Sequence, residues 1–440
     1  MKLKCYFIFF IAVIFFSCKE REENVFIKVK GTKFILKNKP YYFAGANIYY
    51  AAYLGASKEG RERLLKELDL LNSYGITNIR IMGASEYSSF KKAIHECFIL
   101  GPNEYNEQLL QGLDFALSEI GKRKMHAIIY LTNYWQWSGG MTQYLKWAND
   151  FQATDPDVNN EWRDYMTQSA TFYRSDTAQK IFRDYVYMLI NRKNTFSNIL
   201  YKDDPAIMAW ELANEPRPGP DKDNDSINIE ILTKWVDQTA QFIHSIDPNH
   251  LVCSGSEGIV GCVQSIDGFL KIHCSKYIDY LNFHLWPKNW GWFNSIQPEK
   301  TFSSTIYKTT NYILIHIELA RKLGKPITLE EFGMERDSGK YNIESTVFYR
   351  NKFFQHITNL LLDSINNNSP IAGFNFWAWG GYGFPANVDE VNIKNPMSFV
   401  GDPLSEPQGL NSIFASDTST LKIFRNFYHN IKNISDTKAY

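Results

Sequence analysis

Neither sign of charge is in excess in this sequence, because its 440 residues contain 47 Lys and Arg and 47 Asp and Glu. Proteins that bind nucleic acid usually carry a basic surface, so the composition predicts no nucleic-acid partner. The chain also lacks a G-x-G-x-x-G turn after its first predicted strand, where dinucleotide-binding folds place one. We therefore expect a neutral ligand, and the 15% of aromatic residues suits stacking against flat apolar faces.

Cysteine is scarce, with six residues in the whole chain, and no C-x-x-C motif or His-rich tract accompanies it. The sequence therefore predicts no metal site and no cofactor. Two cysteines lie near the N-terminus, and the other four are Cys97, Cys253, Cys262 and Cys274. Spacing does not give connectivity, so these four are expected either to form disulfides or to remain buried thiols.

Long apolar runs are missing except at the N-terminus, where Lys2 and Lys4 precede an apolar run from Tyr6 to Phe16. This run is shorter than the about 20 residues that a membrane-spanning helix needs. With Ser17 directly before Cys18, the segment resembles a bacterial lipoprotein signal peptide.

The resemblance implies that residues 1–17 are removed, that a lipid is attached to Cys18, and that residues 18–25 form a tether. The acidic-rich stretch at residues 19–23 is similar to the export tag of surface lipoproteins. We therefore expect an extracellular or cell-surface protein that the lipid holds in the outer membrane. The alternative is an ordinary secretory signal peptide with an incidental cysteine.

Eight apolar segments have the length and the flanking turns of buried parallel strands. They are Phe43 to Tyr49, Thr77 to Met82, Met125 to Thr132, Ala206 to Leu212, Leu251 to Ser254, Ile278 to His284, Pro326 to Glu331 and Ile371 to Trp377. Helical patterns separate them, at Gly60 to Tyr74, Glu107 to Arg123, Thr177 to Arg192, Leu232 to Ile246, Asn311 to Leu323, Thr346 to Ile365 and Thr420 to Ile431. Right-handed βα units add strands in one direction, so residues 26–440 are predicted to form a single (β/α)8 TIM barrel domain.

A short hairpin and several long connections complete the predicted barrel. The stretch from Phe26 to Leu36 alternates and turns near Gly31, which predicts an N-terminal β-hairpin at the barrel bottom. Long ordered loops usually build a site. Such βα loops are expected at the C-terminal face, at Asn133 to about Ser175, Pro216 to Ile229, Leu285 to Phe302 and Trp379 to about Asp417, with Gly219 to Asn228 as a solvated loop. An open doubly wound sheet is the alternative architecture, which the missing glycine-rich turn disfavours.

Two predicted strands that are more than a hundred residues apart end in carboxylates followed by Pro or Gly. One ends in Asn214-Glu215-Pro216 and the other in Glu330-Glu331-Phe332-Gly333. Carboxylates at strand ends meet at the mouth of a barrel, where two of them can divide the cleavage of a glycosidic bond. We expect Glu215 to be the general acid/base, with a raised pKa, and Glu331 to be the nucleophile.

Neighbouring acids compete for these roles. Glu211 shares a strand face with Glu215 but lies deeper, so we interpret it as a hydrogen-bonding group of the barrel interior. Alternation is expected to send Glu330 and Glu331 to opposite faces, and the sharp exit that follows favours Glu331 as the nucleophile. Arg80, near the end of the second strand, is expected to be the partner of a buried ion pair or to lower the pKa of Glu331 by pairing with it.

Three more strand-end side chains are candidates for the site. Asn214 directly precedes the proposed acid and is expected near the 2-hydroxyl of the sugar. His284 ends the sixth strand and is either a site residue or a structural histidine. Trp377 ends the eighth strand and is placed to stack against a sugar ring, or else to pack in the core.

At these residues the chain resembles glycoside hydrolase family 5, whose active-site set stands in the same order at its strand ends. Further motifs resemble its endo-β-1,4-mannanase subfamily: residues 192–195 and 201–217, Asn133-Tyr134-Trp135, Gly139-Gly140, Tyr144, residues 255–258, Gly401-Asp402-Pro403 and Glu406-Pro407-Gln408-Gly409. The resemblance implies hydrolysis of internal β-1,4-mannosidic bonds in mannan, glucomannan or galactomannan. It extends over nearly the whole chain after the signal peptide.

The resemblance also implies a retaining double displacement, in which Glu331 attacks the anomeric carbon and Glu215 then activates water. Arg217 and Glu257 are implied to contact sugars on the leaving-group side. Asn133 and Trp135 are implied to belong to the same substrate-binding site.

One residue departs from the family pattern, because many members carry Tyr where this chain has Trp286. That tyrosine donates its hydroxyl to the nucleophile, and the indole N–H of Trp286 is the candidate replacement. Two alternative functions stay open: another β-glucanase of family 5, and a surface lipoprotein that binds glycan without cleaving it. The presence of both glutamates argues against the second, because a binding protein gains nothing from two crowded carboxylates.

Overall fold

The computed structural model describes residues 25–220, 225–385, 391–392 and 394–437. The predicted signal peptide and residues 18–24 of the predicted tether lie outside the described residues. Within the described part of the chain, no helix is long and apolar enough to span a membrane.

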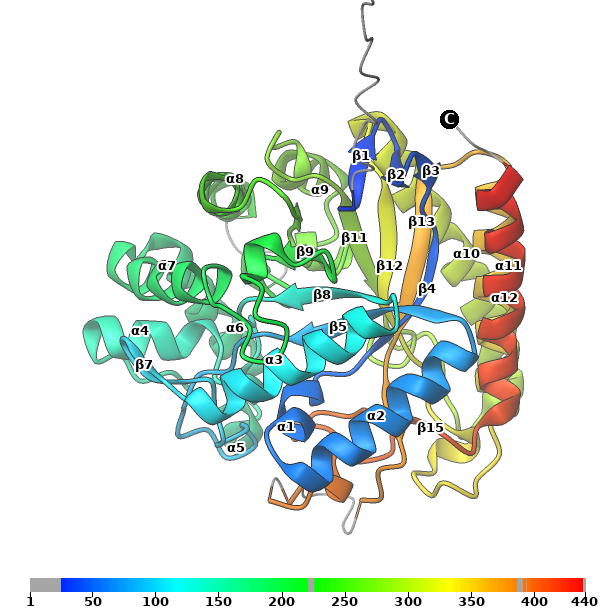
Figure 1. Cartoon of the computed structure of the whole chain (residues 1–440), viewed down its shortest axis with the longest axis horizontal. Coiled ribbons are helices and arrows are strands. Elements are labelled where there is room, and N and C mark those ends of the chain that lie inside the picture. The colour runs from blue at the N-terminus through cyan, green and yellow to red at the C-terminus, as the bar shows by residue number, and fades with distance from the viewer. Residues whose placement is uncertain (1–24, 221–224, 386–390, 393, 438–440) are drawn as a thin grey trace, which may run out of the picture.

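Eight parallel strands form the centre of the molecule, and helices surround them (Figure 1). The strands are buried on both faces, as expected for a parallel sheet that helices cover. In chain order they are β4 (Phe43–Asn47), β5 (Ile76–Met82), β8 (His126–Tyr130), β9 (Ile207–Glu211), β10 (Leu251–Cys253), β11 (Leu281–Leu285), β12 (Ile327–Phe332) and β13 (Ile371–Phe376). Each overlaps one of the eight predicted segments, so the predicted (β/α)8 architecture is confirmed.

The barrel is nearly closed. Its strands are ordered β10-β9-β8-β5-β4-β13-β12-β11, so β10 and β11 are the two edges. Asp279, just before β11, connects these edges, since its N–H donates to the carbonyl of Val252 at 2.9 Å and its Oδ2 accepts from the N–H of Val252 at 2.7 Å. The C-terminal ends of all eight strands therefore lie at one rim, where barrel enzymes carry their sites.

A helix follows each barrel strand on the outside of the sheet (Figure 1). These helices are α2 (Lys58–Ser73), α3 (Glu107–Lys122), α7 (Asp176–Ile190), α8 (Asp225–Ile246), α9 (Ile266–His273), α10 (Pro298–Leu323), α11 (Phe348–Asn366) and α12 (Thr418–Thr437). Four begin at a capping side chain, because Ser57, Asn106, Ser175 and Ser265 each accept a hydrogen bond from the backbone N–H three residues later. Of these eight helices, only α9 was not predicted, because its eight residues are too few for a clear periodic pattern.

Two helices begin earlier than their apolar pattern predicts. Helix α8 begins at Asp225 rather than Leu232, and α10 begins at Pro298 rather than Asn311. Their first turns are largely exposed, so the apolar face that marks them in the sequence is weak. The expected loop from Gly219 to Asn228 is therefore wrong at its end, which is helical, and its residues 221–224 lie outside the described residues.

A small antiparallel sheet closes the N-terminal end of the barrel (Figure 1). It contains β1 (Lys28–Lys30), β2 (Lys33–Leu36) and β3 (Lys39–Pro40). The predicted hairpin accounts for β1 and β2, and Gly31, with a φ of 60°, supplies the turn between them. The ring of Phe34 meets the ring of Tyr280 edge-on with centroids 5.2 Å apart, which seats the small sheet against the start of β11.

The connections at the opposite, C-terminal rim contain secondary structure of their own. Between β8 and α7 lie α4 (Met141–Asn149), α5 (Pro156–Asn159) and α6 (Trp162–Ala170), and the connection from β13 to α12 contains β14 (Trp379–Gly381) and β15 (Ile413–Phe414). A hairpin of β6 (Ile99–Gly101) and β7 (Glu104–Tyr105) follows β5, where no long connection was predicted. Residues from two of these connections, such as Trp162 in α6 and Glu406 between β14 and β15, form part of the wall around the mouth of the barrel.

All four cysteines in the described residues are free. Cys97, Cys253 and Cys262 are buried, and Cys274 is exposed. Of the two expectations, disulfide formation is wrong, and the buried thiol is right for three of the four.

Candidate active site

The two predicted catalytic glutamates come together at the C-terminal rim. Glu215 follows β9 with a φ of 51°, a left-handed conformation that residues other than glycine rarely adopt outside turns and functional sites. Glu331 lies near the end of β12. Nδ1 of His284, in β11, is 2.7 Å from Oε1 of Glu215 and 3.3 Å from Oε2 of Glu331. These atoms all lie within 4.8 Å of one another, so the carboxyl groups face one small gap.

One buried arginine joins this gap to the barrel interior. Both oxygens of Glu211 accept hydrogen bonds from Arg80, at 2.7 Å from Nε and 2.5 Å from Nη2. Nη1 of the same guanidinium donates to Oε1 of Glu331 at 2.5 Å. Asn47 and Asn214 accept further hydrogen bonds from it at 2.9 and 2.8 Å. Arg80 is therefore both the partner of a buried ion pair and the cation beside Glu331.

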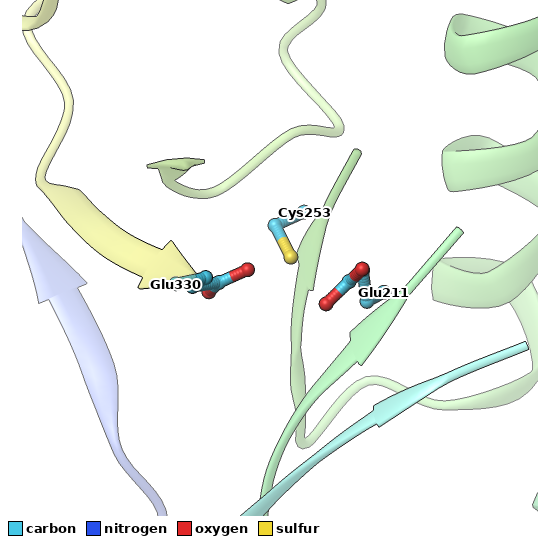
Figure 2. Close-up of side chains that lie close together, drawn as sticks. All are labelled: Glu211, Cys253 and Glu330. Atoms are coloured by element: carbon cyan, nitrogen blue, oxygen red, sulfur yellow. The ribbon is translucent and has the colours of Figure 1, made fainter. Parts of the chain in front are cut away.

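A β-bulge in β12 overturns the prediction that Glu330 and Glu331 face opposite ways. Pairing with β11 skips one residue after Leu329, so Glu330 has no partner in the ladder. Its carboxyl group lies within 4.8 Å of the side chains of Glu211 and Cys253, which belong to strands that do not pair with β12 (Figure 2). Such a contact is made across the barrel interior. Both acids thus turn inward, because the extra residue breaks the two-residue period of the strand.

Glu215 has the environment of a general acid. Burial raises its pKa, and the opposing contributions of Arg217, Trp135 and Arg80 do not cancel that effect. Nε1 of Trp135 donates a hydrogen bond to Oε2 of Glu215 at 2.6 Å. A carboxyl group with a raised pKa keeps the proton that a leaving group requires.

The pKa of Glu331 departs from the sequence-based expectation. Burial raises it above the ordinary value, Glu215 and Glu211 add to the rise, and Arg80 acts in the opposite direction. Arg80 does lower the pKa of Glu331, as predicted, but burial raises that pKa by more. The charged form that a nucleophile needs depends on the 2.5 Å contact with the guanidinium.

His284 is a neutral ring at ordinary pH, because burial lowers its pKa to about 3 and Arg80 adds to the effect. Its Nδ1 faces both glutamates, and its Nε2 has no hydrogen-bond partner among the described residues. A neutral imidazole brings the two carboxyl groups together through one nitrogen without adding a full charge between them.

A cavity of about 620 Å³ opens over the two glutamates. Six of the predicted binding residues line it: Trp135, Asn214, Arg217, Glu257, Trp286 and Trp377. The other three, Arg80, Asn133 and His284, are buried behind the wall. Oδ1 of Asn133 accepts from Nδ2 of Asn214 and from the backbone N–H of Trp135, both at 3.1 Å, so its place is to hold wall residues in position.

Two tryptophans form the apolar part of the wall. The rings of Trp286 and Trp377 meet edge-on, with centroids 6.0 Å apart and planes at 76°. Trp286 lowers the pKa of Glu215 as a hydrogen-bond donor. Among the described residues no hydrogen bond joins the indole of Trp286 to Glu331, so its donor role toward the nucleophile stays a prediction, and its effect is the lowered pKa of Glu215.

An ion pair stands beside Glu215 on another part of the wall. Nη2 of Arg217 contacts Oε2 of Glu257, and the guanidinium lies 5.1 Å from the centroid of the Trp135 ring. Nε1 of Trp290 donates to Oε1 of Glu257 at 3.1 Å. Burial raises the pKa of Glu257 to about 7 even against the attraction of Arg217.

Most of the remaining wall was not predicted as part of the site. It contains Gln136, Trp137, Trp162, Val260, Gln264, Asn289, Trp290, Trp292, Pro403, Ser405 and Glu406. Most of these residues lie several positions beyond a strand end, and a prediction based on strand ends cannot identify them. Glu406 belongs to a motif that carried the family resemblance, which is the one sequence signal that could have identified it. Burial and the nearby Asp402 raise the pKa of Glu406 to about 8.

Replacing Trp135 by Phe tests the hydrogen bond to the acid. The indole donor lowers the pKa of Glu215, so its loss should raise that pKa further, by roughly half a unit to one unit. We expect the alkaline limb of kcat/KM, measured against pH, to move upward by that amount. Trp162→Phe is the matched control, because Trp162 lines the same cavity and meets Trp135 edge-on at 6.2 Å. An unmoved limb in W135F, or an equal shift in W162F, contradicts the assignment.

Known proteins with similar sequences carry mannan-degrading names. "Mannan endo-1,4-beta-mannosidase 3" of Arabidopsis thaliana is 28% identical over 422 residues, which cover 92% of this chain and 92% of that protein. "Mannan endo-1,4-beta-mannosidase 4" of Solanum lycopersicum is 28% identical, covering 84% of this chain and 87% of that protein.

Solved structures and a family comparison agree with these relatives. A glycoside hydrolase family 5 mannosidase from Rhizomucor miehei superimposes with a TM-score of 0.86 at 30% identity, covering 94% of this chain and 100% of the other. The endo-1,4-beta-mannanase from the same fungus, at 23% identity and a TM-score of 0.66, shares the fold. Residues 24–436 match the family described as "GH family 5 beta-mannosidase-like". The chain therefore belongs to glycoside hydrolase family 5, in its β-mannosidase-like group, and is a glycoside hydrolase.

Proposed function

We propose that the protein hydrolyses β-1,4-mannosidic bonds with retention of the anomeric configuration. The observation that carries the proposal is the gap between Glu215 and Glu331, whose facing atoms lie within 4.8 Å of one another and of His284. Retaining glycosidases hold their two carboxyl groups about 5 Å apart, whereas inverting enzymes leave room for a water molecule between them. The short gap therefore favours direct attack by one carboxylate.

In the first step, Glu331 attacks the anomeric carbon while Glu215 gives its proton to the leaving oxygen. The raised pKa of Glu215 keeps that proton available. In the second step, the ionised Glu215 takes a proton from water, which attacks the anomeric carbon and releases Glu331. Arg80 stabilises Glu331 as a free carboxylate before the first step and after the second.

The wall of the cavity suits a neutral sugar chain. Trp377 and Trp286 offer apolar ring surface beside the nucleophile, and sugar faces stack on such rings without any charge. Arg217 and Glu257 offer polar atoms to sugar hydroxyls on the side of the acid. The names of the relatives support mannose units as substrate, so mannan, glucomannan and galactomannan are the proposed polymers.

Removing either glutamate tests the double displacement. Glu215→Ala and Glu331→Ala should each lower kcat on β-1,4-mannan by several orders of magnitude, because each acid carries a separate part of the chemistry. NMR of the first products of the wild type should show the β-anomer before mutarotation. Glu318→Gln, on the surface of α10, serves as the control and should keep wild-type turnover. An α-anomer as the first product, or near-normal turnover in either alanine variant, contradicts the mechanism.

Internal cleavage is the mode that the names of the curated relatives favour. A second candidate is cleavage from chain ends, which two observations favour. The solved protein with the TM-score of 0.86 is called a mannosidase. The connection between β14 and β15 also brings Pro403, Ser405 and Glu406 into the lining of the same cavity as Trp377, a position from which we expect them to limit the room for a continuing chain.

The products of mannohexaose and the viscosity of galactomannan separate these two modes. Internal cleavage should give mixed oligosaccharides early, with a steep loss of viscosity for each reducing end released. Cleavage from chain ends should give mannose or one short product and little loss of viscosity. Cellulose and xyloglucan are the comparison polymers, and turnover of cellulose alone would favour the β-glucanase alternative over both modes.

We also propose that a lipid on Cys18 holds the enzyme at the outer membrane, as the sequence before that cysteine favours. In a bacterial host, Cys18→Ala should abolish incorporation of labelled palmitate and move the protein out of the membrane fraction. Cys5→Ala, within the predicted signal peptide, should keep both properties and is the control. A C18A protein that remains labelled and membrane-bound contradicts the proposal.

A further inference from the structure

Below the catalytic gap, Glu330 has a hydrogen-bond pattern unlike that of a carboxylate. Its Oε1 accepts from the hydroxyl of Tyr280 at 2.9 Å and from the hydroxyl of Thr328 at 3.1 Å. Its Oε2 is buried and has no hydrogen-bond partner among the described residues. An ionised carboxylate would leave a charged oxygen without a donor, which is costly in a buried place. A neutral acid avoids the cost of the uncompensated charge, with Oε1 as the carbonyl oxygen and Oε2 as a hydroxyl beside Glu211 and Cys253.

Among the described residues, Arg80 is the cation that acts on Glu330, and its N–H groups are already bound to other side chains. Its carboxyl group points toward Cys253 and Glu211 (Figure 2), and the donor and acceptor atoms of these three side chains lie within 4.8 Å of one another. Both oxygens of Glu211 are already bound to Arg80. Nη1 of the same guanidinium donates to Oε1 of Glu331. A charge on Glu330 would therefore compete with Glu211 and Glu331 for a single arginine.

We propose that Glu330 is held as a neutral carboxylic acid and that, in this form, it positions Glu211 and Arg80 beneath the nucleophile. It touches no substrate and acts through Arg80, so it is a positioning residue. The inference rests on the proposed function, in which Glu331 is the nucleophile. It adds a role for the acid that the bulge in β12 turns inward.

The titration of Glu330 agrees with this geometry. Burial raises the pKa of Glu330 to about 8, Glu211 adds to the rise, and Arg80, Tyr280 and Thr328 lower it less. Burial also raises the pKa of the Cys253 thiol well above its ordinary value, so that neighbour is neutral too. The proton thus stays on Glu330 through the neutral range.

This raised pKa has a consequence for stability. In the unfolded chain the acid ionises near 4.5, whereas in the folded protein it ionises near 8. The unfolded state therefore loses its proton first, and Glu330 reduces the stability progressively as pH rises from about 4.5 to about 8. An amide at this position has no such penalty.

Two variants of Glu330 test whether a neutral polar group at this position is enough for activity. Glu330→Gln keeps an acceptor for Tyr280 and Thr328, offers N–H donors in place of the hydroxyl, and carries no charge. Glu330→Ala removes all of these groups. On β-1,4-mannan we expect E330Q to keep kcat within about twofold of the wild type and E330A to lose at least about tenfold in kcat with KM nearly unchanged. Glu318→Gln is the surface control.

Two measurements detect the proton on Glu330 without relying on enzyme activity. Infrared difference spectra between the wild type and E330Q at pH 6.5, roughly midway between the two pKa values, should contain the C=O band of a protonated carboxyl group. Thermal unfolding from pH 5 to pH 8 should show E330Q gaining in melting temperature over the wild type as pH rises, while E318Q stays parallel to the wild type.

Four results would overturn the proposal: E330Q as slow as E330A, E330A as fast as the wild type, a spectrum with only a carboxylate band, or a melting-temperature gap that does not grow with pH. Circular dichroism of E330A confirms that a loss of kcat occurs in folded protein. A wild type that cleaves no β-mannoside disproves the proposed function instead, and the infrared and unfolding measurements then decide whether the neutral acid exists.

Discussion

The buried guanidinium of Arg80 is shared between carboxylates from two strands that do not pair with its own. It projects from β5, binds both oxygens of Glu211 at the end of β9, and reaches Glu331 in β12. Taking a charge out of water costs several kcal/mol per ion, so the arrangement persists only because each N–H finds a partner. Loss of the arginine would leave buried acids uncompensated, at about 3–5 kcal/mol by comparison with other buried pairs. The position of Glu331, the proposed nucleophile, depends on this one cation.

The same cation sets a limit on how many acids near it can ionise. Glu211, Glu330 and Glu331 all lie in the barrel near Arg80, and His284 is neutral and brings no second positive charge. The barrel therefore gives chemically identical side chains different surroundings by their place in the network. Arg80 donates hydrogen bonds to both oxygens of Glu211 and to one oxygen of Glu331, but to neither oxygen of Glu330. Unequal environments of this kind are how one fold holds an acid and a base together.

Sequence reasoning recovered the parts of this site that strand periodicity governs. Polar side chains lie near or just after the ends of the apolar runs in β5, β9, β11 and β12, so the sequence places Arg80, Glu215, His284 and Glu331 at one rim. The burial of Glu211 beneath Glu215 followed from the same spacing. Prediction was wrong for Glu330, because a bulge depends on pairing with β11 and leaves no mark in the local sequence.

The wall of the cavity was less predictable for a related reason. Trp290, Trp292 and Glu406 reach the cavity from long connections, where three-dimensional packing and not periodicity decides which side chains point inward. The same limit applies to the first turns of α8 and α10, which are largely exposed and so carry only a weak apolar pattern. Residues that depend on contacts distant in sequence need the fold before they can be assigned.

The small sheet of β1, β2 and β3 has a consequence for how the enzyme would meet its polymer. It sits at the pole of the barrel opposite the catalytic rim, and the described chain begins there at Val25 (Figure 1). A segment that precedes Val25 therefore joins the folded domain at the end of the barrel opposite the mouth. The lipid attachment proposed for Cys18 would therefore join the barrel at the pole away from its mouth, so that the mouth and the bilayer attachment lie at opposite ends of the domain.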